Sequence, residues 1–184
     1  TSPLPGMIRA CRKLQEYPVD FIAIPCNSAS AYLNDIQAEV EVPILNIMEI
    51  TANALLAAFP GMKRVAVMGG VITYREKIYS KFLEANGIEY VHHGEKAQSA
   101  IERIIEEIKL NTVSSRAIHE THELVLELKE SYLADGIILG CTEFGCLQNL
   151  ELPLPTIDSS TELARHIVQR ITTAEGMADE QPAV

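Results

Sequence analysis

Two cysteines end matching apolar segments of this sequence, and a thiol in such a position could transfer protons. Segment 20–28 ends in Ile-Pro-Cys26-Asn-Ser, and segment 135–143 ends in Leu-Gly-Cys141-Thr-Glu. Laid over one another, the segments align Asp with Asp and Cys with Cys. We interpret them as an internal duplication that places one thiol on each side of a substrate. One thiol could then remove a proton from one face of a carbon atom while the other protonates the opposite face.

Each cysteine directly follows a predicted strand and precedes a predicted helix. Ligands bind at the carboxyl ends of parallel strands, and a helix N-terminus favours an anion. Such surroundings lower a thiol pKa from about 8.5 to roughly 3.5–7.5. Asn27, Ser28 and Thr142 supply short side chains that could cap the helices or bind a substrate carboxylate. The alternative, that Cys26 and Cys141 are small buried hydrophobic residues, is disfavoured by their matched contexts.

Helical and strand patterns alternate along the chain in the order typical of parallel α/β sheets. Apolar runs predict strands at 19–24, 43–47, 64–68, 88–91, 136–139 and 156–157. Helical periodicity predicts helices at 7–16, 29–40, 50–59, 74–86, 97–110, 115–133 and 160–171. These elements would bring both cysteines to the carboxyl ends of sheets.

The order of elements predicts two pseudo-symmetric parallel-sheet α/β domains with the active site between them. The first spans 1–60 and the second 61–157, with a boundary at Pro60-Gly61. Residues 158–173 are predicted as a C-terminal helix that returns to the first domain, and 174–184 as a flexible tail. The first domain reaches its cysteine strand without the elements that precede Cys141, so we expect it to lack its N-terminal elements.

Composition narrows the class of partner. The chain has 184 residues, with 25 Asp and Glu against 15 Lys and Arg, for a net charge of −10. This sign disfavours nucleic acid and anionic membranes as partners. Because no apolar run approaches the ~20 residues of a membrane helix and no signal-peptide pattern opens the chain, we expect a cytoplasmic protein. The four cysteines show no CxxC spacing, which predicts free thiols.

The residues around the two cysteines resemble a known family. Pro25-Cys26-Asn27-Ser28 is similar to the PCNT motif, and Gly140-Cys141-Thr142-Glu143 to the GCTE motif, of the cofactor-independent aspartate/glutamate racemases. Glu143 indicates the aspartate racemase branch, because glutamate racemases usually carry His there. The resemblance implies an amino-acid racemase, acting on aspartate by two-thiol proton transfer at Cα. It implies no cofactor and no metal, and a homodimer as the common assembly.

The same resemblance implies which residues act. Cys26 and Cys141 would be catalytic, and the substrate would be bound by Asn27, Ser28, Thr73, Lys109, Thr142 and Glu143. Lys109 resembles a lysine that lies near the substrate carboxylate, although a solvated lysine favoured by a helix end explains it equally well. Ser30 stands where the aspartate branch commonly has His, which leaves the substrate side chain open. The family's opening strand and glycine-rich loop have no counterpart in this sequence.

Three alternatives remain beside a racemase. A related decarboxylase or cis–trans isomerase could use the same scaffold, and an inactive amino-acid-binding remnant is a third option.

His119 and His122 have a spacing that could bind a metal, but their acidic neighbours favour a solvated helix face. Cys11 and Cys146 are interpreted as structural.

Overall fold

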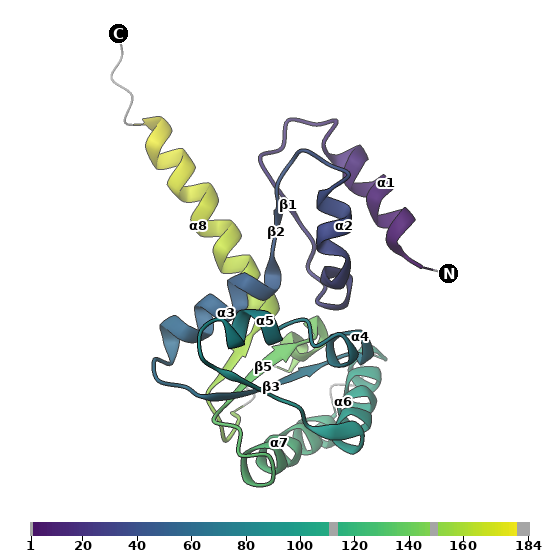
Figure 1. The fold of residues 1–184 in the computed structure, drawn as a ribbon, viewed down its shortest axis with the longest axis vertical. Helices are drawn as coiled ribbons and strands as arrows, with labels where there is room; N and C mark the ends of the chain where they lie inside the picture. Colours follow the sequence, from purple (N-terminus) through teal and green to yellow (C-terminus); the bar gives the residue numbers. More distant parts are fainter. Residues whose placement is uncertain (1, 111–113, 148–150, 180–184) are drawn as a thin grey trace.

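The computed structural model describes residues 2–110, 114–147 and 151–179, which form two parallel sheets and their helices (Figure 1). The smaller sheet pairs β1 with β2, and the larger has the order β4-β3-β5-β6. The strands are β1 (Ile22–Ala23), β2 (Ile44–Leu45), β3 (Arg64–Gly69), β4 (Glu89–Val91), β5 (Gly136–Gly140) and β6 (Thr156–Asp158). Every pairing is parallel, so the predicted α/β class with parallel sheets is confirmed.

Helices connect these strands. The α-helices are α1 (Leu4–Leu14), α2 (Leu33–Gln37), α3 (Ile47–Ala58), α4 (Val71–Arg75), α5 (Ser80–Glu84), α6 (Gly94–Lys109), α7 (Ser115–Glu130) and α8 (Ser159–Asp179). Two short 3₁₀ helices, η1 (Ser28–Tyr32) and η2 (Thr142–Cys146), follow the two cysteines.

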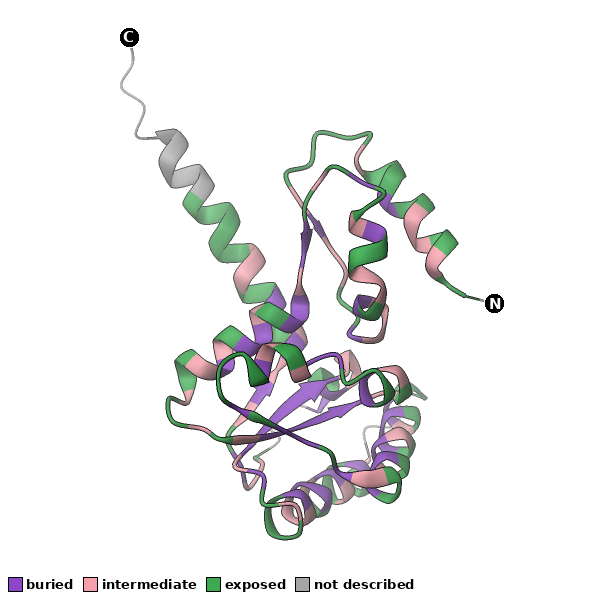
Figure 2. Ribbon diagram, viewed as in Figure 1, coloured by how far each residue is buried: buried purple, intermediate pink, exposed green. Residues whose placement is uncertain are grey.

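The larger sheet is covered by helices on both faces, which explains its continuous apolar strands. Alternate residues of β3 point to opposite faces: Ala66 and Met68 pack with α6 and α7, whereas Val65 and Val67 pack with α3 and α5. Figure 2 shows the strands of this sheet buried among the helices in the lower part of the molecule. The sheet is therefore a rigid base for whatever lies at the ends of its strands.

Strands β3 and β5 form the topological switch point of this sheet. They pair along their length up to Gly69 and Gly140, yet β4 follows β3 on one edge and β6 follows β5 on the other. The chain therefore leaves the two strands in opposite directions and opens a crevice at their carboxyl ends. Ligands of open α/β sheets bind at such a crevice.

The first unit, α1 to β2, stands above the larger sheet with its own small core (Figure 1). Ile22, Ile36 and Ile44 are buried there together with Cys11, in line with a structural role for that cysteine. Helix α3, which the sequence analysis grouped with this unit, packs its buried side against the larger sheet. The predicted boundary at Pro60-Gly61 therefore separates two segments that share one core.

The last helix joins the two parts. Helix α8 lies along α3, and the guanidinium of Arg170 stacks 5.4 Å from the ring centre of Phe21, just before β1. The helix continues to Asp179, so residues 174–179 of the predicted tail are helical. Residues 180–184 of that prediction lie outside the described residues.

The prediction of one helix over 74–86 is wrong. The chain forms α4 and α5 instead, separated by Lys77 in a left-handed conformation (φ 45°). This turn directs Ile78 and Tyr79 into the core, where both are buried. The helix predicted over 29–40 is likewise divided, into η1 and the short α2. In both places tertiary packing overrides the helical pattern.

Candidate active site

A cavity of about 420 Å³ lies at the switch point and receives residues from both parts of the chain. It contains every predicted site residue except Thr73. Its lining is Cys26, Asn27, Ser28, Gly70, Val71, Ile72, Glu102, Ile105, Glu106, Lys109, Gly140, Cys141, Thr142 and Glu143. The two thiols thus share one cavity, Cys26 from the loop after β1 and Cys141 from the end of β5.

The thiol of Cys141 is held by a carboxylate. Its Sγ donates a hydrogen bond of 2.8 Å to Oε2 of Glu143, two residues along the chain. Burial, the hydrogen bond to Glu143 and the negative charge of Glu143 together raise the pKa of Cys141 to about 12, against a smaller opposing effect of Lys109. Cys141 is therefore a protonated thiol near neutral pH.

This result corrects one expectation. A helix N-terminus was predicted to lower the pKa of both thiols, but each cysteine precedes a 3₁₀ helix of only five residues. The dipole of so short a helix is small, and so is its effect on a thiol pKa. At Cys141 burial and the Glu143 carboxylate outweigh it, and the pKa of the thiol rises.

Glu143 and Lys109 form the charged side of the site. Burial alone would raise the pKa of Glu143, but hydrogen bonds from Cys141 and Thr142 and the charge of Lys109 lower it overall. Lys109 Nζ lies 2.9 Å from Oε1 of Glu106, and this ion pair raises the pKa of Lys109. Glu143 is thus an ionised base in contact with a thiol.

The loop that carries Cys26 is fixed from its backbone. The amide of Cys26 donates to the carbonyl of Ile24 at 2.8 Å, and the hydroxyl of Ser30 donates to the carbonyl of Cys26 at 3.0 Å. The side chain of Cys26 itself is exposed. The loop therefore holds the thiol open to the cavity without enclosing it.

A buried hydrogen-bond network ties Asn27 to the larger sheet. The Tyr79 hydroxyl donates to Oδ1 of Asn27. Nδ2 of Asn27 donates to the Ser159 hydroxyl at 2.9 Å, which donates to the carbonyl of Leu139 at 2.8 Å. Leu139 lies two residues before Cys141, so this network connects the Cys26 loop to the strand that ends in Cys141. Sequence analysis did not single out Ser159.

Thr73 does not line the cavity. It is 1% exposed, and its Oγ1 has no hydrogen-bond partner among the described residues. A Cβ placed on Gly69 would lie 2.5 Å from Cγ2 of Thr73, which shows how closely the side chain packs on β3. The cavity is lined instead by Gly70, Val71 and Ile72, just before it.

Glu102 is a cavity residue that sequence analysis missed. Its Oε1 accepts a hydrogen bond of 2.9 Å from Nε2 of Gln98, which is 4% exposed. Glu102, Glu106 and Lys109 follow one another at spacings of four and three, so they share a face of α6. The spacing of these three residues in the sequence is the signal that indicates their shared helix face.

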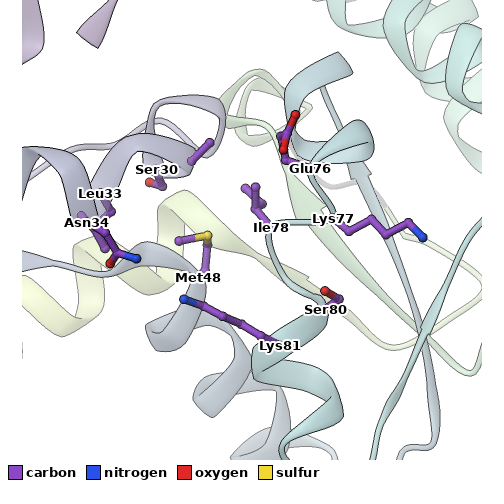
Figure 3. A pocket seen from close by; sticks show the side chains of 10 residues that line it. Ser30, Leu33, Asn34, Met48, Glu76, Lys77, Ile78, Ser80 and Lys81 are labelled. Atoms are coloured by element: carbon purple, nitrogen blue, oxygen red, sulfur yellow. The ribbon is translucent and has the colours of Figure 1, made fainter. Parts of the chain in front are cut away.

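A second cavity, of about 260 Å³, lies between the first unit and the α4–α5 segment and contains neither thiol. Figure 3 shows Ser30 and Asn34 on one side of it and Ile78 and Lys81 on the other, with Met48 between them, whereas the side chain of Lys77 extends away. His119 and His122, on α7, line neither of these cavities.

Within the described ranges, no three His, Cys, Asp or Glu side chains are grouped as a metal site would require. None of the helices in these ranges has the length and apolarity to cross a membrane.

The chain belongs to the Asp/Glu/hydantoin racemase family, whose sequence model matches residues 1–167. The fold and the paired cysteines agree with that assignment. The resemblance noted from the two cysteine motifs is therefore confirmed.

Individual relatives are similar over most of the chain. The broad-specificity amino-acid racemase RacX of Bacillus subtilis is 37% identical over 166 residues, which are 89% of this chain and 70% of that protein. A glutamate racemase of Staphylococcus aureus is 24% identical over 143 residues, 76% of this chain and 52% of its own length. The crystal structure of an aspartate racemase homologue from Pyrococcus horikoshii matches with a TM-score of 0.75 at 26% identity, covering 90% of this chain and 72% of that one.

Proposed function

We propose that this protein is an amino-acid racemase that needs no cofactor and works by two-thiol proton transfer at Cα. The observation that carries the proposal is that Cys26 and Cys141, from different parts of the chain, line one cavity. A carbon atom held between them can lose its proton to one sulfur and gain a proton from the other. Family membership and the similarity to RacX support an amino acid as substrate.

In this mechanism the two thiols start in different protonation states. Cys141, whose pKa is raised to about 12, carries a proton and acts first as the acid. Cys26, open to the cavity, acts as the thiolate that takes the α-proton. After this transfer Cys26 carries the proton and Cys141 is the thiolate, so in the reverse direction Cys141 acts as the base and Cys26 as the acid.

The substrate carboxylate needs donors, because an α-proton becomes acidic only when the charge that develops on the carboxylate is stabilised. Asn27, Ser28, Thr142 and Lys109 line the cavity and supply such donors. Aspartate, which the Cys-Thr-Glu motif indicates, is one candidate substrate. We further propose a homodimer, as the family resemblance implies, and a cytoplasmic location, as expected from the sequence.

The experiment is to follow conversion of L- to D-amino acids by the purified chain and by Cys26→Ser and Cys141→Ser. Each variant should lose at least about a thousandfold in kcat, since serine is a far weaker base and acid than cysteine near neutral pH. Cys146→Ser, a change at an exposed cysteine outside the cavity, serves as the matched control. Racemisation that survives either replacement would rule out the two-thiol mechanism, and release of carbon dioxide would indicate a decarboxylase.

A further inference from the structure

Glu102 is the one carboxylate of the cavity lining for which the described residues provide no charged partner. Glu143 accepts hydrogen bonds from Cys141 and Thr142, and Glu106 pairs with Lys109. Glu102 accepts only the neutral amide of Gln98. With three carboxylates and one ammonium, the described lining carries two negative charges in excess. Lys109 pairs with Glu106 and acts on Glu143 through its charge, so Glu102 is the carboxylate that it compensates least.

A buried network orients this carboxylate. The amide nitrogen of Gln98 donates to Glu102 at 2.9 Å and to the carbonyl of Gly69 at 3.0 Å. These two acceptors fix which end of the amide is nitrogen, so its Oε1 must accept a hydrogen from Nε2 of His93 at 3.1 Å. His93 and Gln98 are 0% and 4% exposed. The buried Gln98 and His93 side chains thus orient the Glu102 carboxylate, which lines the cavity.

The position of Glu102 along α6 tells which part of a substrate can reach it. The charge of Lys109 acts on both Cys141 and Glu143, so these three groups lie near one another in the cavity. Glu102 precedes Lys109 by seven residues, about 10 Å along the helix axis. The end of a long substrate side chain can span such a distance from the groups around Lys109.

We propose, on the basis of the function proposed above, that Glu102 selects amino acids whose side chain ends in a cation, such as lysine or ornithine. The carboxylate would pair with the terminal ammonium in a partly buried cavity. A second substrate carboxylate, as in aspartate, would meet a like charge there and bind less well. The substrate class is then basic amino acids rather than dicarboxylic ones.

The test compares three L-amino acids with the full chain: lysine, norleucine, which keeps the length but lacks the ammonium, and aspartate. Affinity is measured by titration calorimetry, and turnover by α-deuteration in deuterated water. Lysine should bind at least about tenfold better than either competitor, as expected for a hydrogen-bonded charge pair. Glu102→Gln should abolish that preference without weakening norleucine, and Glu95→Gln, an exposed change of the same kind on the same helix, should leave it intact.

The outcomes separate the two proposals. If lysine binds with the expected dependence on Glu102 but no α-deuterium enters, the substrate class stands and the racemase function fails. If aspartate is bound and deuterated in preference to lysine, or Glu102→Gln leaves the preference unchanged, the function stands and the role of Glu102 is overturned. Failure of all three amino acids to bind would overturn both.

Discussion

The thiol of Cys141 and the carboxylate of Glu143 are joined by a hydrogen bond of 2.8 Å, so an acid and its base lie side by side at the end of β5. Cys26 enters the same cavity from a different part of the fold. The two thiols therefore have different surroundings, although their sequence contexts match. A reaction that runs in both directions needs both a proton donor and a proton acceptor, and this asymmetry provides them.

Replacing Glu143 by Gln should make Cys141 more reactive as a thiol. The substitution removes the negative charge that opposes ionisation, so the pKa of Cys141 should fall from about 12, while burial still keeps it above its ordinary value. Alkylation of Cys141 at pH 8 should then rise about tenfold or more, because the thiolate fraction grows tenfold for each pKa unit lost. Mass spectrometry of iodoacetamide-treated protein measures this, with the exposed Cys146 as internal reference. An unchanged ratio of the two would show that Glu143 does not control the thiol.

The raised pKa of Cys141 also predicts loss of stability at alkaline pH. Its ordinary value is 9.0 and its folded value about 12, so the unfolded chain releases the proton first. The stabilising contribution is complete below pH 9 and is lost as the pH rises towards 12. Cys141→Ser should therefore show a smaller fall in Tm between pH 8 and 10.5 than the wild type. Cys146→Ser should match the wild type, and equal slopes in all three proteins would contradict the burial of Cys141.

The hydrogen-bond network around Asn27 predicts that Tyr79→Phe and Tyr90→Phe have different effects on the free energy of unfolding. Tyr79→Phe removes the donor to Oδ1 of Asn27 and should cost about 1–3 kcal/mol of unfolding free energy, because a buried acceptor is left unpaired. Tyr90 is also buried, but its hydroxyl has no hydrogen-bond partner in the described structure. Tyr90→Phe should therefore be neutral or slightly stabilising. Urea denaturation measures both.

The same pair tests whether Asn27 is positioned for catalysis. Tyr79→Phe should lower kcat more than it raises KM, because a displaced Asn27 loop shifts Cys26 away from the reacting carbon. Tyr90→Phe should retain wild-type kinetics. Equal kinetics in the two variants would leave the network with a purely structural role.

The role of Thr73 can be tested, because the family resemblance implies that it binds substrate whereas its side chain is buried. Thr73→Val keeps the shape and removes a buried hydroxyl that lacks a partner, so stability should rise by about 1 kcal/mol with kcat/KM unchanged. In Thr121→Val, the matched control, the lost hydroxyl donates to the carbonyl of Ala117 at 2.7 Å, so no gain is expected. A tenfold or larger fall in kcat/KM for Thr73→Val would place Thr73 at the substrate after all.

Sequence alone predicted the features that depend on local pattern. Parallel strands followed from continuous apolar runs such as Val65 to Met68, and the cavity followed from cysteines at strand ends. Long-range packing could not be predicted from sequence patterns. The left-handed turn at Lys77, for example, exists because Ile78 and Tyr79 enter the core. The Asn27–Ser159 bond joins residues 132 positions apart, and no periodicity signals it. The pKa of Cys141 depends on burial, which a helix-terminus argument ignores.

Early isotope exchange can show whether two thiols act on opposite faces of one carbon atom. The wild-type chain is incubated with an L-amino acid substrate in deuterated water, and both enantiomers are analysed by chiral separation and mass spectrometry before equilibrium. We expect the D-product to carry α-deuterium while the remaining L-substrate keeps its hydrogen, because each face of the carbon is served by a different sulfur. Deuterium that enters both enantiomers equally from the start would indicate a single base and rule out the two-thiol mechanism.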